Sequence, residues 1–346
     1  MTQDIESFSV KNTDYPNNCV SCIGGREENQ DSCAITMTRR GFLAVVCDGM
    51  GGMNGGEIAS RIAAEEIIRY LDEPASEGDL DDDNQMALRK AVCSANLAVR
   101  TKALEKPSLS GMGTTVTAVL INDEKATIAY VGDSRIYQIR KGKKKFRTFD
   151  HSMVFEMVKE GVLTEEQARL SAQSNIILRA LGTKDDIEVE TYDLPYDKGD
   201  IFFLCSDGIW GTMPEKELIK RISLKQPPKA VTEKLAAYVN NLGIKQGGRH
   251  DNLTAAMLVT TGNSKLRSKM EDTIKKVCIA LSILLTVSVL GNCLHFLPKK
   301  DKADFSFAGK EYIITNIVNN GVTLEDSTYH FSIKSDNVQE INNKTE

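Results

Sequence analysis

The sequence predicts a domain that combines strands and helices, followed by a single transmembrane helix. Short apolar runs rich in β-branched residues are typical of buried strands. Two longer stretches repeat apolar residues at helical spacing, and a later stretch of 21 residues contains no Lys, Arg, Asp or Glu. The strand candidates are Phe42–Cys47, Thr115–Ile121, Thr127–Val131, Ile201–Cys205 and Leu253–Thr260.

The two helical stretches are Glu57–Leu71 and Asn84–Lys106. The second carries Leu88, Val92 and Val99 at intervals of four and seven residues, which places them on one face of a helix. The acidic stretch between the two helices is predicted to be a solvated loop.

Residues 148–183 separate two strand-rich regions and have a helical pattern of their own. Ser152 can cap one helix, and Thr164 with Gln167 has the spacing of a capping box for another. The zone ends at Gly182. We therefore expect a helical insertion that covers a sheet and contacts substrate.

The uncharged run occupies residues 277–297 and is long enough to span a bilayer core of about 30 Å. Lysine pairs at 275–276 and 299–300 bracket it as interfacial anchors would. A buried helix is the alternative interpretation. We expect a basic juxtamembrane linker at 263–276, then the span, then a small extracytoplasmic tail at 298–346 that contains a hairpin-like pattern.

The cysteines indicate the cellular compartment in which the domain lies. Cys19 and Cys22 form a C-x-x-C pair, but no second pair follows at the spacing of a zinc ribbon. Cys33, Cys47 and Cys205 lie in or beside apolar runs, where reduced cysteines pack as small hydrophobic side chains. Lys and Arg are almost evenly divided across the span, so charge alone does not orient it. The reduced cysteines favour a single-pass protein of the cytoplasmic membrane with its catalytic domain in the cytoplasm.

Composition excludes some classes of function. The chain has 346 residues, enough for one large domain or two smaller ones. A net charge of -5 argues against a nucleic-acid binder. With four histidines, metal chemistry would have to use carboxylates, which favours Mg²⁺ or Mn²⁺ over zinc. Residues 1–18 are polar and show no signal peptide.

Aspartates stand at the ends of predicted strands. Asp48 and Asp207 follow apolar strands and precede glycines, Asp251 precedes a strand, and Asp133 follows one. A carboxylate beside a core is costly unless it is paired or bound to metal. Glycines let the backbone approach an ion, so the Gly49 carbonyl can be a ligand. Together these residues predict a site in which two hard cations share an aspartate and bind a phosphate.

Arg26 lies four residues before the pair Gln30-Asp31, in the segment GGREENQD. The planar guanidinium of arginine suits bidentate binding of phosphate. Without these neighbours, Arg26 would be interpreted as an ordinary surface residue.

These motifs, in this order, resemble the metal-dependent protein serine/threonine phosphatases of type 2C in their bacterial form. The resemblance covers about residues 19–262. It rests on RxxNQD at 26–31, DGMGG at 48–52, GMGTT at 111–115, GDSR at 132–135, DHS at 150–152, NIILRALG at 175–182, SDG at 206–208 and DN at 251–252.

The resemblance implies an α+β fold for residues 1–262: a four-layer αββα sandwich of two antiparallel sheets flanked by helices, with metals at one end. By position, Asp48 would bridge two core Mn²⁺ or Mg²⁺ ions, helped by the Gly49 carbonyl. Asp207 and Asp251 would complete the shell of one ion.

The same resemblance assigns further roles. Asp31 and Gln30 would act directly or through water, and Arg26 would bind the phosphate. Asp133 with Asp207 would form a weaker site for a third metal.

The insertion at 148–183 resembles the variable flap of the family, with substrate contacts expected between Ser152 and Arg179. Two positions depart from the pattern. Gln30 replaces a glutamate of many relatives, which removes one charge. Met50 replaces a histidine proposed as general acid in some eukaryotic relatives, and methionine cannot donate a proton.

The implied function is hydrolysis of phosphoserine and phosphothreonine in proteins, by direct attack of a hydroxide that bridges two metal ions and without a phosphoenzyme. Two alternatives stay open: a non-catalytic membrane-tethered module that binds phosphoproteins, and a phosphatase of small phosphorylated metabolites. The expected partners are phosphorylated proteins, among them a membrane serine/threonine kinase, and no nucleic acid.

Overall fold

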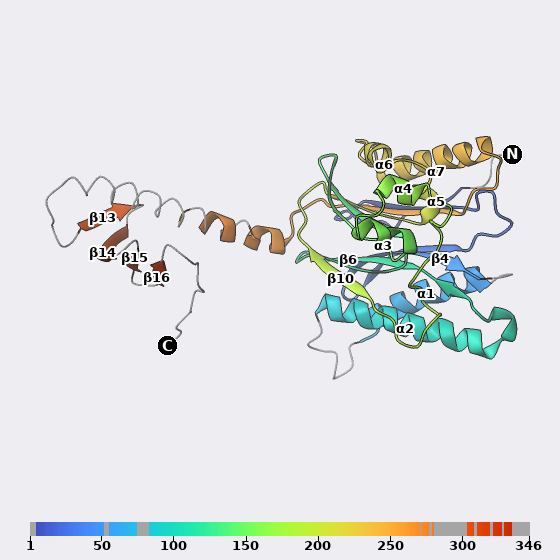
Figure 1. Cartoon of the computed structure of the whole chain (residues 1–346), viewed down its shortest axis with the longest axis horizontal. Coiled ribbons are helices and arrows are strands. Elements are labelled where there is room, and N and C mark those ends of the chain that lie inside the picture. The colour runs from blue at the N-terminus through green and yellow to red at the C-terminus, as the bar shows by residue number, and fades with distance from the viewer. Residues whose placement is uncertain are drawn as a thin grey trace. The chain divides into compact units, whose positions relative to one another are not determined.

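A computed structural model of the chain describes residues 5–51, 55–74, 83–270, 272–276 and 279, together with the strands at 303–307, 310–318, 321–326 and 329–333 (Figure 1). The chain divides into two compact units, Met1–Thr273 and Ile274–Glu346, which are described separately.

Two six-stranded sheets form the centre of the first unit. One has the order β1 (Glu6–Phe8), β2 (Asn17–Cys22), β12 (Leu253–Val259), β11 (Ile201–Cys205), β8 (Arg135–Arg140) and β9 (Lys143–Arg147). The other has the order β10 (Glu190–Leu194), β7 (Ala126–Val131), β6 (Val116–Ile121), β4 (Gly41–Met50) and β3 (Asp31–Thr38), with β5 (Gly113–Thr114) paired to β4. The strand pairings of this unit are antiparallel, as predicted.

Helices cover the outer face of each sheet (Figure 1). α1 (Gly55–Asp72) and α2 (Asn84–Glu105) lie on the second sheet, and the two predicted helices match them within two residues at each end. The first sheet carries α6 (Glu215–Ile222) and α7 (Pro228–Lys245), which the sequence interpretation missed. The remaining helices are η1 (Pro107–Leu109), α3 (Met153–Lys159), α4 (Glu165–Arg169) and α5 (Asp207–Trp210).

Alternation along β4 explains the four layers. Phe42, Ala44 and Val46 pack between the two sheets, whereas Leu43, Val45 and Cys47 pack against α1 and α2. Successive side chains of a strand point to opposite faces, so a strand covered on both faces is apolar throughout. Each fully buried Leu, Val or Phe stabilises the fold by about 1.5–3 kcal/mol. The predicted αββα sandwich is confirmed.

The insertion at 148–183 is helical, as predicted, and contains α3 and α4. Thr164 and Gln167 form the capping box of α4. Ser152 occupies the N-cap position of α3, but its hydroxyl makes no capping hydrogen bond and is buried without a partner. The predicted position of Ser152 at the start of a helix is therefore confirmed, but the predicted capping hydrogen bond is absent.

Cys19 is disulfide-bonded to Cys33, not to Cys22. The bond joins β2 of one sheet to β3 of the other, because the two residues face each other across the interior of the sandwich. The expectation of reduced cysteines is wrong for this pair. It holds for Cys22, Cys47 and Cys205, which are buried and free.

The second unit contains a four-stranded antiparallel sheet of β13 (Ala303–Phe307), β14 (Lys310–Val318), β15 (Gly321–Asp326) and β16 (Tyr329–Ile333). The predicted hairpin-like pattern at 311–317, 322–324 and 329–333 corresponds to β14, β15 and β16, and β13 was not predicted. Among the described residues, none of the helices combines the length and apolarity that crossing a membrane requires. The predicted span at 277–297 lies outside the described residues except for Ile279.

Candidate metal centre

The predicted aspartates converge at one end of the sandwich. Asp48 lies near the end of β4 and is paired in register with Asp31 at the start of β3. Asp207 follows β11, Asp251 precedes β12, and Asp133 follows β7. In antiparallel sheets the end of one strand lies beside the start of its neighbour. Ligand candidates spread over the whole chain are thereby brought to a single edge.

A cleft of about 730 Å³ opens at this end. Asp48, Asp133, Asp207, Asp251 and Gly49 all line it, as the sequence predicted. Asp31 lies behind the cleft and is 8% exposed. The other lining residues are Gly25, Arg26, Glu27, Glu28, Gln30, Met50, Gly51, Asn175, Ile177, Arg249 and Asn252. Asn175 and Ile177 belong to the insertion, which therefore reaches the site.

The carboxylates of the cleft raise one another's pKa values. Burial raises the pKa of Asp31 to about 7 and that of Asp207 to about 6, and neighbouring aspartates add to both effects. The pKa values of Asp48 and Asp133 are raised well above the ordinary value by burial and then by nearby carboxylates. Crowded carboxylates disfavour the charged form of each, and a divalent cation would reverse this effect.

Asp133 gives a separate indication of a cation. Both of its carboxylate oxygens are buried and have no hydrogen-bond partner, whereas its backbone carbonyl accepts a hydrogen bond of 3.0 Å from Trp210 Nε1. A buried carboxylate with neither a partner nor an ion is strongly destabilising. The donor set therefore fits a hard cation such as Mn²⁺ or Mg²⁺.

The side chains are not gathered into a preformed metal cluster. Among the described residues, no group of three His, Cys, Asp or Glu side chains has the spacing to hold an ion. Asp251 Oδ2 instead forms an ion pair of 2.7 Å with Arg26 Nη2, and Asp31 Oδ2 accepts a hydrogen bond of 2.8 Å from Ser206 Oγ. Arg26 thus reaches the cleft as predicted, but it is bound to a predicted ligand.

The backbone of Asp48 is fixed by the GMGTT segment. Asp48 N donates to Thr115 Oγ1 at 3.0 Å, and the Asp48 carbonyl accepts from Thr115 N and Thr114 Oγ1 at 2.8 and 2.9 Å. Thr115 Oγ1 lies 2.8 Å from Ser134 Oγ, beside Asp133. The two threonines therefore set the spacing between two of the candidate ligands.

Gly49 stands where chain segments cross closely. A Cβ atom at this position would lie 2.0 Å from the Gly56 carbonyl oxygen and 2.5 Å from that of Gln30. Gly49 N donates to the same Gln30 oxygen at 3.1 Å. This crossing requires glycine and exposes the backbone to the cleft.

Asn252 holds the loop that carries Arg26, a role that sequence reasoning did not assign. Its Nδ2 donates to the carbonyls of Ile23 and Glu28 at 2.8 and 2.9 Å, and its Oδ1 accepts from Gln30 N at 2.9 Å. The DN motif signalled the position but not these partners.

A buried ion pair supports the Asp133 side of the cleft and was also missed. Arg135 Nε and Nη2 donate to the two carboxylate oxygens of Asp150 at 2.8 and 2.7 Å. The guanidinium carbon lies 3.5 Å from the ring centroid of Trp210. The GDSR and DHS segments contain these residues, but only the fold shows that they pair.

An αββα sandwich with an acidic cleft at one end is the architecture expected of a metal-dependent protein phosphatase. The model of the family described as protein phosphatase 2C matches residues 20–267. The chain belongs to this family, in its bacterial serine/threonine form.

Curated relatives support the assignment. The chain is 32% identical over 238 residues to the serine/threonine phosphatase stp of Listeria monocytogenes, covering 68% of this chain and 88% of the relative. It is 31% identical over 239 residues to protein phosphatase PhpP of Streptococcus pneumoniae, covering 67% and 92%.

Solved structures agree. The phosphatase MsPP of Mycobacterium smegmatis, in complex with cacodylate, superposes with a TM-score of 0.60 at 29% identity, covering 70% of this chain and 97% of that one. The catalytic domain of PstP in complex with two manganese ions superposes with a TM-score of 0.59 at 26% identity, covering 71% and 98%.

Proposed function

We propose that the protein hydrolyses phosphoserine and phosphothreonine in proteins with the help of two Mn²⁺ or Mg²⁺ ions. The observation that carries the proposal is the cleft in which Asp48, Asp133, Asp207 and Asp251 face one space. The names of the relatives and the two manganese ions of PstP support both the substrate class and the metal.

Asp48 would hold both core ions, with the Gly49 carbonyl beside it. Asp207 and Asp251 would complete the coordination shell of one ion. Asp31, which lies behind them, and Gln30 would contact the ions directly or through water. Divalent ions at these positions would lower the pKa of water and neutralise the phosphate.

Asp133 and Asp207 would hold a third, weaker ion. The unpartnered carboxylate of Asp133 supports this assignment. The hydroxyl of its neighbour Ser134 lies 2.8 Å from Thr115 Oγ1, which also accepts a hydrogen bond from Asp48 N.

Arg26 would bind the phosphate of the substrate. Its side chain is 54% exposed at the mouth of the cleft and is paired with Asp251. A cation that binds Asp251 neutralises that carboxylate, which leaves the guanidinium free for bidentate contact with phosphate oxygens. Met50 also lines the cleft and cannot protonate the leaving alkoxide, so the proton must come from another group or from water.

Asn175 and Ile177 bring the flap to the cleft, and exposed Leu170, Ile176 and Leu178 lie near them in the chain. This mixture of apolar and polar groups would contact the polypeptide that flanks the phosphorylated residue.

The protein would be tethered to the cytoplasmic membrane through residues 277–297, with the catalytic unit in the cytoplasm and residues 298–346 outside. The length of the uncharged run and its flanking lysines support the tether. The free, buried Cys22, Cys47 and Cys205 support the cytoplasmic side. Such a tether would hold the enzyme near membrane serine/threonine kinases. Recovery of the full chain in the soluble fraction after cell lysis would refute the tether.

Activity is tested with a phosphothreonine peptide and Mn²⁺, comparing the natural protein with Asp207→Asn. The variant should lose at least about 100-fold in kcat, as expected when a group that stabilises transition-state charge is removed. Asp186→Asn, an exposed aspartate outside the cleft, is the matched control and should retain full activity. An inactive natural protein, or an unimpaired Asp207→Asn, would refute the proposal. A higher rate on free phosphoserine than on the peptide would instead assign a metabolite substrate.

A further inference from the structure

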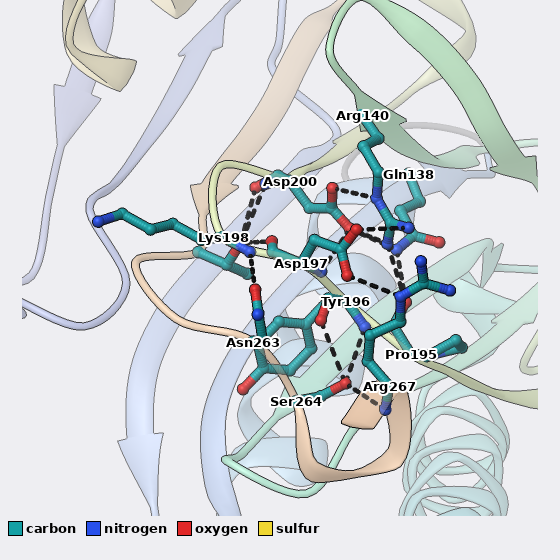
Figure 2. Close-up of polar contacts among 11 residues, drawn as sticks. Gln138, Arg140, Pro195, Tyr196, Asp197, Lys198, Asp200, Asn263, Ser264 and Arg267 are labelled. Atoms are coloured by element: carbon teal, nitrogen blue, oxygen red, sulfur yellow. Dashed lines mark hydrogen bonds and ion pairs between the residues drawn. The ribbon is translucent and has the colours of Figure 1, made fainter. Parts of the chain in front are cut away.

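The chain leaves β12 at the end of the sandwich opposite the cleft, where a polar network fixes it (Figure 2). Ser264 N donates to the Tyr196 carbonyl, and Ser264 Oγ accepts from Tyr196 N, both at 2.9 Å. Arg267 Nε lies 2.9 Å from Asp197 Oδ1, and Asp197 also pairs with Arg140 at 2.8 Å. The start of the linker is therefore part of the folded unit.

The acidic turn between β6 and β7 is bound to the same segment. Lys265 N and Leu266 N donate to the carbonyls of Asp123 and Glu124, each at 2.9 Å. Lys265 Nζ also lies 3.0 Å from the carboxylate of Asp123 and 2.8 Å from that of Glu124. Lys265 thus offsets part of the negative charge of this turn, whose carboxylates are 75% and 45% exposed.

A group of basic residues at this end has no such partner. Lys141, Lys143 and Lys198 are exposed, and among the described residues none of them has an acidic group within 4.0 Å. Lys141 and Lys143 flank the tip of the β8–β9 hairpin, and the side chain of Lys198 projects away from the polar network in Figure 2. Arg39, exposed at the β3–β4 turn, belongs to the same group. We call these four residues the basic end.

Charge is thus segregated along the strands. The cleft end carries five aspartates: Asp31, Asp48, Asp133, Asp207 and Asp251. The chain as a whole has a net charge of -5. At the opposite end, Asp14 and Asp123 are exposed acids; Lys11 lies close to Asp14 in the chain, and Lys265 pairs with Asp123. The exposed basic side chains would attract an anionic partner to the basic end.

We propose that the basic end docks on anionic phospholipid headgroups at the membrane surface. The four residues stand on three separate turns, as suits a flat partner, and the linker that leaves this end continues to the lysine pair at 275–276 and the predicted span. Clusters of basic residues just cytoplasmic of a span are attracted to anionic lipid. The inference rests on the proposed tether and adds the orientation of the first unit, with the basic end toward the lipid and the cleft away from it.

The orientation has a consequence for substrate choice. β4 has 10 residues, so at about 3.4 Å per residue the cleft would stand roughly 30 Å from the lipid. The enzyme would therefore act on phosphorylated segments that extend into the cytoplasm and not on sites at the lipid surface.

Residues 1–273 are suitable for the test because solved relatives consist of this unit alone: MsPP is covered over 97% of its length. Binding to vesicles of phosphatidylglycerol and phosphatidylcholine is measured by co-sedimentation at low salt, with pure phosphatidylcholine as reference. The test variant is Lys141→Gln/Lys143→Gln/Lys198→Gln. The matched control is Lys102→Gln/Lys106→Gln/Lys184→Gln, which removes three charges in and beside the second half of α2.

Each basic residue at an anionic surface strengthens binding about fivefold, so the test variant should bind on the order of 100-fold more weakly. The control should match the natural unit, and 0.5 M salt should abolish binding. Equal affinity of the two variants, or no binding to anionic vesicles, would overturn the proposal. Polyglutamate is added as a competitor. If it displaces the unit from the vesicles and binds the unit more tightly than they do, the partner of the basic end is an acidic protein and not lipid. Phosphatase activity should be unchanged in the test variant, so failure here is distinguishable from failure of the proposed function.

Discussion

Arg135→Met should destabilise the first unit strongly, because it leaves a buried carboxylate without its partner. The side chains of Arg135 and Asp150 are 4% and 0% exposed and are joined by two hydrogen bonds of 2.8 and 2.7 Å. The guanidinium also lies over the rings of Trp210 and Phe155, with centroid distances of 3.5 and 4.8 Å. Methionine fills much of the same volume, so the substitution removes mainly charge and hydrogen bonds.

Removing one partner of a buried ion pair costs about 3–5 kcal/mol. Burial raises the pKa of Asp150, and Arg135 opposes that rise. Without Arg135 the folded-state pKa rises further above the unfolded value, so the free energy of unfolding of the variant should fall as the pH increases through that range. The loss should therefore be larger at pH 8 than at pH 5.

Denaturant titration of residues 1–273 measures the effect at both pH values. The control is Lys159→Met, which breaks the exposed Lys159–Glu156 pair and should cost at most about 1 kcal/mol. The double variant Arg135→Met/Asp150→Leu should recover most of the stability, because it leaves no charge buried alone. The reasoning is refuted if Arg135→Met costs no more than Lys159→Met.

Two further predictions concern the cleft. Gly49→Ala should lower stability by about 1–3 kcal/mol and reduce phosphatase activity, because the new Cβ would lie 2.0 Å from the Gly56 carbonyl oxygen. The control is Gly262→Ala, whose Cβ would meet nothing within 4 Å and which should have neither effect. Equal stability and activity of the two variants would contradict the packing argument. In EDTA, the free energy of unfolding should fall between about pH 4 and pH 7, because burial raises the pKa of Asp31 to about 7 and that of Asp207 to about 6, both above their unfolded values. Mn²⁺ should remove this decline, and stability that increases over the same range in EDTA would count against the cluster.

The sequence predicted those elements whose pattern reflects burial. The strand at 42–47 is apolar at every position because helices cover one face and a sheet the other. β9 (Lys143–Arg147) was missed because it is a highly charged edge strand. α7 was missed although it carries an apolar stripe at Val231, Leu235 and Val239. The membrane span at 277–297 stays a prediction.

The candidate site was predictable where it depends on strand ends. Asp48, Asp207 and Asp251 each flank an apolar strand, and antiparallel pairing brings such ends together. Contacts between distant segments have no periodic signature. The Arg26–Asp251 pair and the Cys19–Cys33 bond join residues whose proximity only the fold determines.

The central claim is that the acidic cleft is a metal centre, and calorimetric titration of the EDTA-stripped protein with Mn²⁺ tests it most directly. The natural protein should bind at least two ions per chain, and Asp48→Asn, which removes the shared ligand, should lose both high-affinity ions while remaining folded. Failure of the natural protein to bind Mn²⁺, or undiminished binding by Asp48→Asn, would contradict the account.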